Sequence, residues 1–245
     1  MGKQRETPFG TVKILEAEEI CPAVLEEMEN LVKVSSGPCR VGLTGGSTPQ
    51  AFYKWIEGQH PFPGNIDFWD SILWSCSDER HVSLDDEDSN FGNAQRMMLD
   101  PLGFDEAHCR PWPVYCEPLE AAARFNRLWE EELPGRPVFD LCMLGMGEDC
   151  HTASIFPASP LLVGSMEESF SAVEVPGKGW RLTITPKGLE GCDQILVTVV
   201  GAGKAEALDK VFHGPDDPVA KPVQILKGMA EKVTWLIDSC AAAKL

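Results

Sequence analysis

The sequence has few basic residues and no long apolar run. Its 245 residues include 21 Lys and Arg against 38 Asp and Glu, which gives a formal net charge of −17. This balance argues against a nucleic-acid partner, because nucleic acids bind to broad basic surfaces. No apolar run reaches the roughly 18 residues that span a bilayer, so no membrane association is expected. An anionic small molecule needs a few cations and backbone N–H groups that overcome the overall repulsion locally.

Features of exported or metal-binding proteins are also absent. The first seven residues lack the apolar core of a secretory signal, and no Asn-x-Ser/Thr site occurs. The nine cysteines include no Cys-x-x-Cys pair and no Cys/His cluster with the spacing of a zinc site. We therefore expect a cytoplasmic protein with reduced, mostly buried thiols and with no metal or other cofactor.

Short apolar runs alternate with longer amphipathic stretches along the chain. The runs predict strands at 40–43, 72–77, 139–144, 181–185, 195–200 and 233–237. The stretches predict helices at 18–34, 50–57, 89–99, 117–132 and 204–211. This alternation predicts an α/β fold with a mainly parallel sheet covered on both faces. Ligands of such sheets bind at the carboxyl ends of the strands, where the unusual polar clusters of this chain also fall.

The first polar cluster is Thr44–Pro49, which reads TGGSTP. Gly45 and Gly46 allow close approach of a ligand to the backbone, and the following helix start offers free N–H groups to a phosphate. Ser47 and Thr48 add hydroxyl donors. A tight turn with a hydroxyl helix cap explains the same residues. The cluster also differs by one residue from the Gly-x-Ser-x-Gly nucleophile elbow of serine hydrolases.

Two further clusters follow predicted strands. The charged run from Asp78 to Arg80 is either a solvated loop or part of a site. The loop after residue 144 contains Asp149 and His151, and an imidazole beside a carboxylate can take a proton from water. Its GxGxxC pattern has Cys150 in the third glycine position of the dinucleotide fingerprint, which argues against a nicotinamide cofactor.

Two isolated cations complete the set of candidates. Lys204 follows a Gly-Ala-Gly turn at the start of a predicted helix, which is a second potential anion cradle. Arg181 lies on a predicted strand beside a tryptophan. Together they supply the local positive charge that this acidic chain otherwise lacks.

These motifs occur in the order found in a known family. The chain resembles the 6-phosphogluconolactonases in a series of segments. These are Thr44–Pro49, Asp78–Arg80, Asp88–Gly92, Gly145–Pro157, Arg181–Thr185, Lys204 and the ending 235–243. That family shares a superfamily with the glucosamine-6-phosphate deaminases. The resemblance covers nearly the whole chain and implies a single Rossmann-like three-layer α/β/α domain over residues 1–245, expected to be monomeric.

The resemblance also implies a function and residue roles. The expected reaction is hydrolysis of 6-phospho-D-glucono-1,5-lactone in the pentose phosphate pathway, with no metal required. His151 would activate water as general base, and Asp149 would orient the imidazole or the substrate. The residues implied in substrate and phosphate binding are Gly45, Gly46, Ser47, Thr48, Asp78, Arg80, Arg181 and Lys204.

Three alternatives stay open at this level. The family usually has glycine where this chain has Cys150, so the protein could be a catalytically weakened phosphosugar-binding protein. A deaminase-like isomerase is disfavoured, because deaminases resemble Asp-Glu-Tyr at 78–80 and carry a carboxylate in the segment after the histidine. Residues 152–157 here contain none. A serine esterase would use Ser47 with Asp149 and His151.

Overall fold

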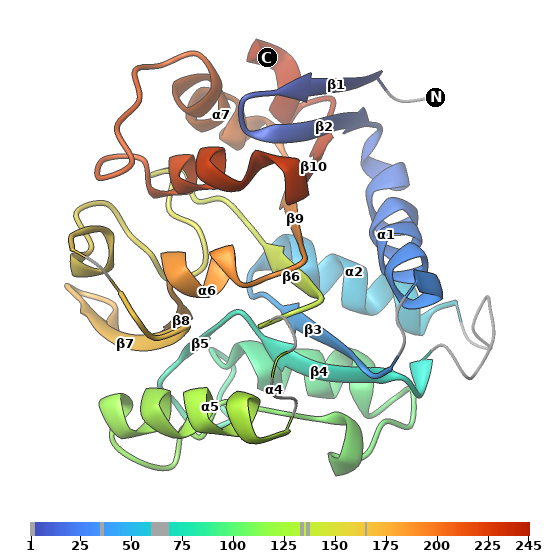
Figure 1. Cartoon of the computed structure of the whole chain (residues 1–245). Coiled ribbons are helices and arrows are strands. Elements are labelled where there is room, and N and C mark those ends of the chain that lie inside the picture. The colour runs from blue at the N-terminus through green and yellow to red at the C-terminus, as the bar shows by residue number, and fades with distance from the viewer. Residues whose placement is uncertain (1–2, 35–36, 60–68, 133–134, 136–137, 165) are drawn as a thin grey trace.

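The computed structural model describes residues 3–34, 37–59, 69–132, 135, 138–164 and 166–245. In these residues, seven strands form the main sheet. The order is β1-β2-β10-β9-β6-β3-β4 (Figure 1). These strands are β1 (Lys3–Thr7), β2 (Gly10–Leu15), β3 (Cys39–Leu43), β4 (Ile72–Cys76), β6 (Leu141–Leu144), β9 (Gln194–Val199) and β10 (Val233–Asp238). Only β1 pairs antiparallel with its neighbour, so the expected mainly parallel sheet is confirmed.

Helices cover both faces of this sheet. The α-helices are α1 (Ile20–Val34), α2 (Ser47–Glu57), α4 (Asn90–Ala94), α5 (Pro118–Glu132), α6 (Pro186–Glu190) and α7 (Ala205–Phe212). A π-helical turn, Gln95–Leu99, continues α4, and 3-10 helices occupy Ala17–Glu19, Glu106–His108, Pro160–Leu162, Ala202–Lys204, Pro222–Lys232 and Ala241–Lys244. In Figure 1, α1 and α2 lie on one side of the central strands, and α6 lies on the other. This arrangement is the expected Rossmann-like three-layer fold.

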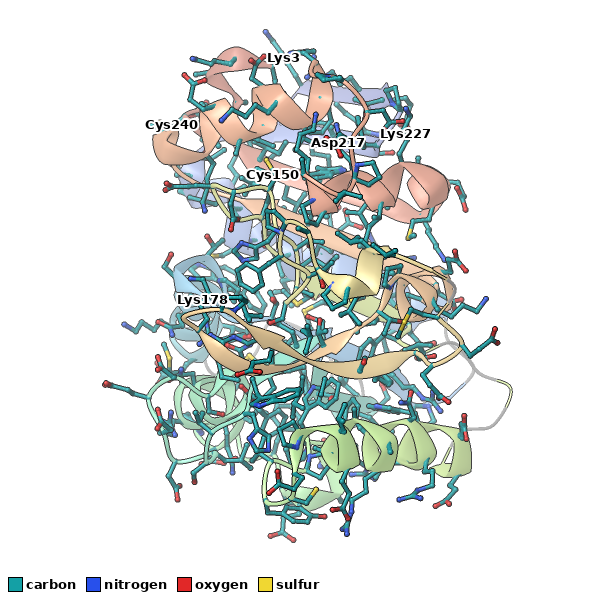
Figure 2. The ribbon with its side chains drawn as sticks, turned by 90° about the vertical axis from the view of Figure 1, so that its left-hand side faces the viewer. Lys3, Cys150, Lys178, Asp217, Lys227 and Cys240 are labelled. Carbon is teal, nitrogen blue, oxygen red and sulfur yellow. The ribbon has the colours of Figure 1, made fainter. Side chains whose placement is uncertain are left out.

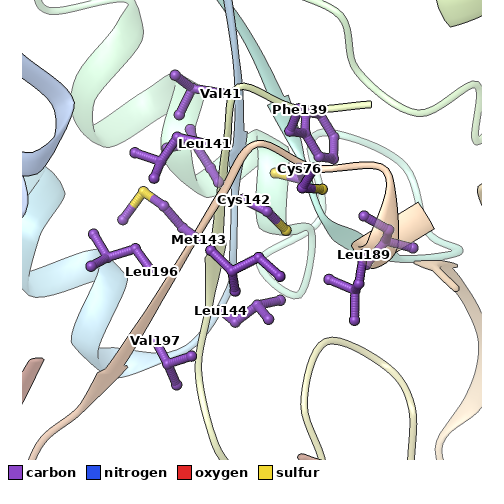
Figure 3. Close-up of a cluster of buried hydrophobic side chains, with 14 of the residues drawn as sticks. Val41, Cys76, Phe139, Leu141, Cys142, Met143, Leu144, Leu189, Leu196 and Val197 are labelled. Atoms are coloured by element: carbon purple, nitrogen blue, oxygen red, sulfur yellow. The ribbon is translucent and has the colours of Figure 1, made fainter. Parts of the chain in front are cut away.

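The central strands explain why the sequence forms such layers. All four residues of β6 are buried, as expected for a strand whose two faces are both covered by helices. Leu141 and Met143 point to one side of the sheet, and Cys142 points to the other, where Phe139 and Leu189 also lie (Figure 3). The short run of apolar residues without polar alternation is the sequence signal of this position.

The structure contains a second, smaller sheet, which the sequence did not predict as separate from the main sheet. It contains three antiparallel strands in the order β5-β8-β7, namely β5 (Asp78–Arg80), β7 (Phe170–Val175) and β8 (Gly179–Ile184). The run Asp78–Arg80 is therefore a short strand, and the interpretation as a solvated loop is wrong for this segment. Asp78 and Glu79 are buried because α4 and β8 pack against the strand.

Other differences lie at the edges of the sheets. The hairpin of β1 and β2 was not predicted, because the exposed KQRET of β1 carries no apolar alternation. The strand β7 was also not predicted, although it packs against α5. The expected strand around Arg181 is real, but it belongs to the small antiparallel sheet.

Gly42 in β3 provides a test of the packing between this strand and the residues that precede β6. A Cβ atom at this position would lie 2.8–3.0 Å from ring carbons of Phe139. We expect Gly42→Ala to lower the free energy of unfolding by about 1–3 kcal/mol through overpacking. The same change should be less destabilising in a Phe139→Leu background, and urea unfolding of the four proteins measures this coupling. Equal effects in both backgrounds would contradict the clash.

Candidate active site

The loops after four parallel strands surround one cavity of about 220 Å³. It lies at the carboxyl ends of β3, β4, β6 and β9, the edge that the sequence predicts for ligand binding. The lining residues are Thr44, Gly45, Gly46, Ser47, Thr48, Pro49, Asp78, Arg80, Asn90, Gly145, Met146, Gly147, His151, Ala153, Thr198, Val199, Val200 and Lys204. Eight of the ten predicted site residues are in this set, and the structure therefore brings them together.

One end of the cavity has the features of an anion site. Gly46 precedes the first turn of α2 with a φ of 104°, a conformation that favours glycine, and no side chain caps this helix end. The backbone N–H groups at the start of α2 are thus available to a ligand, with the positive end of the helix dipole behind them. Arg80 and Lys204 line the same cavity and add positive charge.

Gly45 is required at this end for a different reason. A Cβ atom on Gly45 would lie 1.8 Å from Oδ1 of Asn90, which is buried and also lines the cavity. The Asn90 amide Nδ2 donates to the carbonyl of Asp78 at 2.8 Å, and this bond fixes the orientation of the side chain. The glycine turn and the start of α4 are therefore packed directly against each other.

His151 lies in the same cavity beside a carboxylate. Its Nδ1 atom is 2.5 Å from Oδ1 of Asp149, and its ring stacks on Phe156 at a centroid distance of 4.3 Å. Burial alone raises the pKa of Asp149, but the hydrogen bond and the charge of His151 outweigh it and lower that pKa. The Nδ1–H group of the imidazole donates a hydrogen bond to the ionised Asp149, which leaves Nε2 of the neutral imidazole as a proton acceptor.

Two buried carboxylates hold the loops around the cavity. Asp78 accepts hydrogen bonds from Ser154 at 2.7 Å and from Thr44 at 3.4 Å, and so joins three segments. Glu79 accepts bonds from the backbone N–H groups of Arg80, Asn90 and Phe91 and from the Ser89 hydroxyl, at 2.6–3.1 Å. Burial raises the pKa of Glu79 to about 7, although these backbone bonds act in the opposite direction.

The segment that carries His151 is strained. Cys150, Ala153 and Ala158 have φ values of 64°, 46° and 59°, and they are the non-glycine residues with positive φ in the described part of the chain. Such conformations are unfavourable for residues with a Cβ atom and often occur at functional sites. The expectation that position 150 favours glycine is therefore physically sound.

The Cys150 thiol does not face the cavity. It is buried, lies 3.7 Å from the carbonyl of Ala207 in α7, and is absent from the cavity lining (Figure 2). The Cys150 carbonyl accepts a bond from the N–H group of Val223 at 3.0 Å. The cysteine thus anchors the loop to the helices behind it, which argues against a thiol role in the site.

Arg181 lies outside the residues that line the cavity. It pairs with Arg80 across the small sheet, and its Nη1 atom donates to the carbonyls of Lys178 and Trp180 at 2.5 and 3.1 Å. Burial and then the nearby Arg80 lower its pKa. Its role in substrate contact stays a prediction.

Ser47 lines the cavity, but no hydrogen bond joins it to His151 among the described residues. The serine, carboxylate and imidazole of the esterase alternative are therefore not arranged as a hydrogen-bonded triad in this structure.

Four residues of the site had no predicted role: Glu79, Asn90, Gly147 and Phe156. All four lie in motifs that the sequence analysis singled out. A Cβ atom on Gly147 would lie 2.1 Å from Nδ1 of His151, so the imidazole edge rests on this glycine. Glu79, Gly147 and Phe156 lie in the same motifs as predicted residues, and Asn90 lies in the motif Asp88–Gly92; membership in these motifs is the signal that could have identified them.

Within the described ranges, no three His, Cys, Asp or Glu side chains are grouped in a way that could hold a metal ion. No helix in these ranges is both long and apolar enough to cross a membrane.

Fold and cavity together define a Rossmann-like α/β protein in which an anion-binding turn and a histidine–carboxylate pair share one pocket. The chain belongs to the family of glucosamine-6-phosphate isomerases and 6-phosphogluconolactonases, whose model matches residues 15–235.

Individual relatives agree with this assignment. The chain is 31% identical over 214 residues to a 6-phosphogluconolactonase of Synechocystis sp., with 85% of each chain covered. It is 31% identical over 227 residues to that of Nostoc sp., covering 91% of this chain and 90% of the relative. The crystal structure of 6-phosphogluconolactonase from Leishmania guyanensis superimposes with a TM-score of 0.80 at 26% identity, covering 95% of this chain and 97% of that one.

The buried carboxylate of Glu79 predicts a pH dependence of stability. Its pKa in the folded protein, about 7, lies above the ordinary value of 4.5, so the folded state binds the proton more tightly than the unfolded chain. The contribution of Glu79 should therefore be most favourable below pH 4.5 and should decrease by about 3 kcal/mol as the pH rises through 7.

Urea unfolding of the wild type and Glu79→Gln between pH 4.5 and 8 isolates this contribution, because glutamine does not titrate. The free energy of unfolding of the wild type minus that of Glu79→Gln should decrease with rising pH. A difference that is constant across this range contradicts the raised pKa.

Cys150→Gly tests whether the cysteine weakens the site. Relief of the positive φ and loss of the buried thiol oppose each other, so the free energy of unfolding should change by less than about 1 kcal/mol. Because the thiol points away from the cavity, kcat for lactone hydrolysis should stay near the wild-type value. A large increase in kcat would instead support the weakened phosphosugar-binding protein.

Proposed function

We propose that this protein hydrolyses 6-phospho-D-glucono-1,5-lactone to 6-phospho-D-gluconate, a step of the pentose phosphate pathway. The observation that carries the proposal is that the His151 imidazole and the Gly45–Gly46 turn line one cavity together with Lys204. The relatives named 6-phosphogluconolactonase, at 31% identity over most of both chains, support it.

The reaction follows from the histidine–carboxylate pair. His151 Nε2 takes a proton from a water molecule, whose oxygen forms a bond to the lactone carbonyl carbon. Asp149 holds the proton on Nδ1 and stabilises the imidazolium that forms. The bond between the carbonyl carbon and the ring oxygen then breaks, and the imidazolium returns its proton to that oxygen. Water and lactone are consumed, and the product is the open carboxylic acid.

The phosphate is held at the other end of the cavity. The N–H groups at the start of α2, the hydroxyls of Ser47 and Thr48, and the cations Arg80 and Lys204 surround the position that we assign to it. Binding energy from this remote group orients the carbonyl toward the water molecule. In this proposal, Asp78 supports substrate binding indirectly, because its hydrogen bonds hold the loops around the cavity. Arg181, which is paired with Arg80 in the small sheet, contacts the substrate.

The isomerase reaction of the same family is a weaker candidate for this chain. Residues 152–157, which follow the histidine, contain no carboxylate that could assist opening of a sugar ring. Ser154, in the middle of this segment, is buried, and its hydroxyl is bonded to Asp78. The proposed reaction uses only the imidazole and water at this position.

We further propose that residues 1–245 act as one monomeric unit in the cytoplasm, without a cofactor or a nucleic-acid partner. The cavity draws residues from positions 44 to 204, so a segment that lacked either end of this range would not complete it. The net charge of −17 is unfavourable for polyanions and acceptable for a single phosphate in a local cationic site.

His151→Gln tests the general base. We expect kcat to decrease by about 10²–10⁴-fold, while the affinity for 6-phosphogluconate stays close to the wild-type value. His213→Gln is the matched control, because His213 also bonds an Asp through Nδ1, at 2.9 Å from Asp209, but lies at the exposed end of α7.

The assay must subtract the spontaneous opening of the lactone and should measure deamination of glucosamine 6-phosphate in parallel. Lactone hydrolysis near the wild-type rate in His151→Gln would rule out the base. Deamination by the wild type without lactone hydrolysis would overturn the proposed reaction.

A further inference from the structure

The ring of Phe156 lies against the imidazole through a tight turn. Thr152 and Ile155 pair as an isolated antiparallel bridge, and the Ile155 N–H donates to the Thr152 carbonyl at 2.9 Å. Residues 151 and 156 flank this bridge and therefore face each other. The two rings have a centroid distance of 4.3 Å and an interplanar angle of 24°. We name residues 151–156 the base turn.

The base turn is anchored at its tip and beyond its end. At the tip, the Ser154 hydroxyl donates to buried Asp78 at 2.7 Å, and the Ser154 N–H donates to the Thr183 hydroxyl at 3.2 Å. After the turn, the Ala158 N–H donates to the carbonyl of Val219 at 2.8 Å. The backbone that carries Phe156 therefore cannot move away from the imidazole without loss of these bonds.

The imidazole is constrained from three directions. Asp149 holds Nδ1, Gly147 lies under the Nδ1 edge, and Phe156 covers a face of the ring. The direction that remains is toward the cavity, which His151 lines and Phe156 does not. Phe156 is thus placed to affect the site through its contact with His151.

A cation completes the stack. Lys178 lies on the hairpin between β7 and β8 (Figure 2), and its ammonium group is 5.6 Å from the centroid of the Phe156 ring. The Lys178 carbonyl accepts a bond from Arg181 Nη1, which holds the tip of this hairpin in place. The small antiparallel sheet is in this way connected to the ring that packs on the imidazole.

We propose that Phe156 is a positioning residue for the general base, and that its flat ring sets the plane of the His151 imidazole so that Nε2 faces the attacking water molecule. This inference rests on the proposed lactone hydrolysis. A branched aliphatic side chain of similar volume fills the space but does not restrict rotation of the imidazole about its Cβ–Cγ bond.

Phe156→Leu tests this role. We expect kcat to decrease about tenfold with KM changed less than about twofold, because only the orientation of the base is lost. Phe156→Tyr keeps the flat ring and should restore kcat to near the wild-type value.

Phe212→Leu is the matched control. Phe212 is half-buried, as Phe156 is, and packs edge-on against Phe9 and Trp235 instead of a catalytic side chain. The Phe212→Leu substitution should leave kcat and KM unchanged. If Phe156→Leu keeps the wild-type kcat, or Phe212→Leu lowers kcat equally, the positioning role is refuted.

Proton NMR of the imidazole separates this inference from the proposed function. The ring current of Phe156 should shift the His151 ring protons in the wild type, and the shift should disappear in Phe156→Leu; the resonances are assigned with His151→Gln. Wild-type protein with the ring-current shift but no lactone hydrolysis refutes the function and leaves the stack. Active wild-type protein without the shift refutes the stack alone.

Discussion

The parallel pairing of β3, β4, β6 and β9 is the constraint on which the site depends. Because these strands run in the same direction, their four following loops meet at one edge of the sheet. The anion-binding turn and the imidazole come from loops that are about a hundred residues apart in the chain. Close packing of the central strands on both faces fixes their register, since a shift by one residue would move each side chain to the opposite layer and disrupt the packing.

Buried carboxylates then convert this edge into a defined cavity. The chain is strongly acidic, yet Asp78 and Glu79 are buried and bonded to loops, and Arg80 and Lys204 line the cavity together with Asp78. An unpaired buried carboxylate would be very unfavourable, and the hydrogen bonds of both residues offset much of that penalty. The same bonds hold the glycine turn, the start of α4 and the base turn at fixed positions.

The sequence predicted five of the seven strands of the main sheet (β3, β4, β6, β9 and β10) and most of the cavity, for identifiable reasons. Apolar runs such as 195–200 and glycine-rich turns such as Thr44–Pro49 have strong local signals. The exposed strand β1 has no such signal. The small sheet could not be separated from the large one, because pairing of β5 with β8 joins segments about a hundred residues apart.

The sequence by itself determined the chemistry that is available: a glycine turn before a helix, a few cations in an acidic chain, and an imidazole two residues after a carboxylate. These features depend on residue type and short spacing, which are local properties. Only the tertiary structure decided that Cys150 points to α7, that Arg181 holds a hairpin tip, and that Phe156 covers the imidazole. Side-chain direction depends on backbone conformation and packing between distant segments, and no local pattern specifies it.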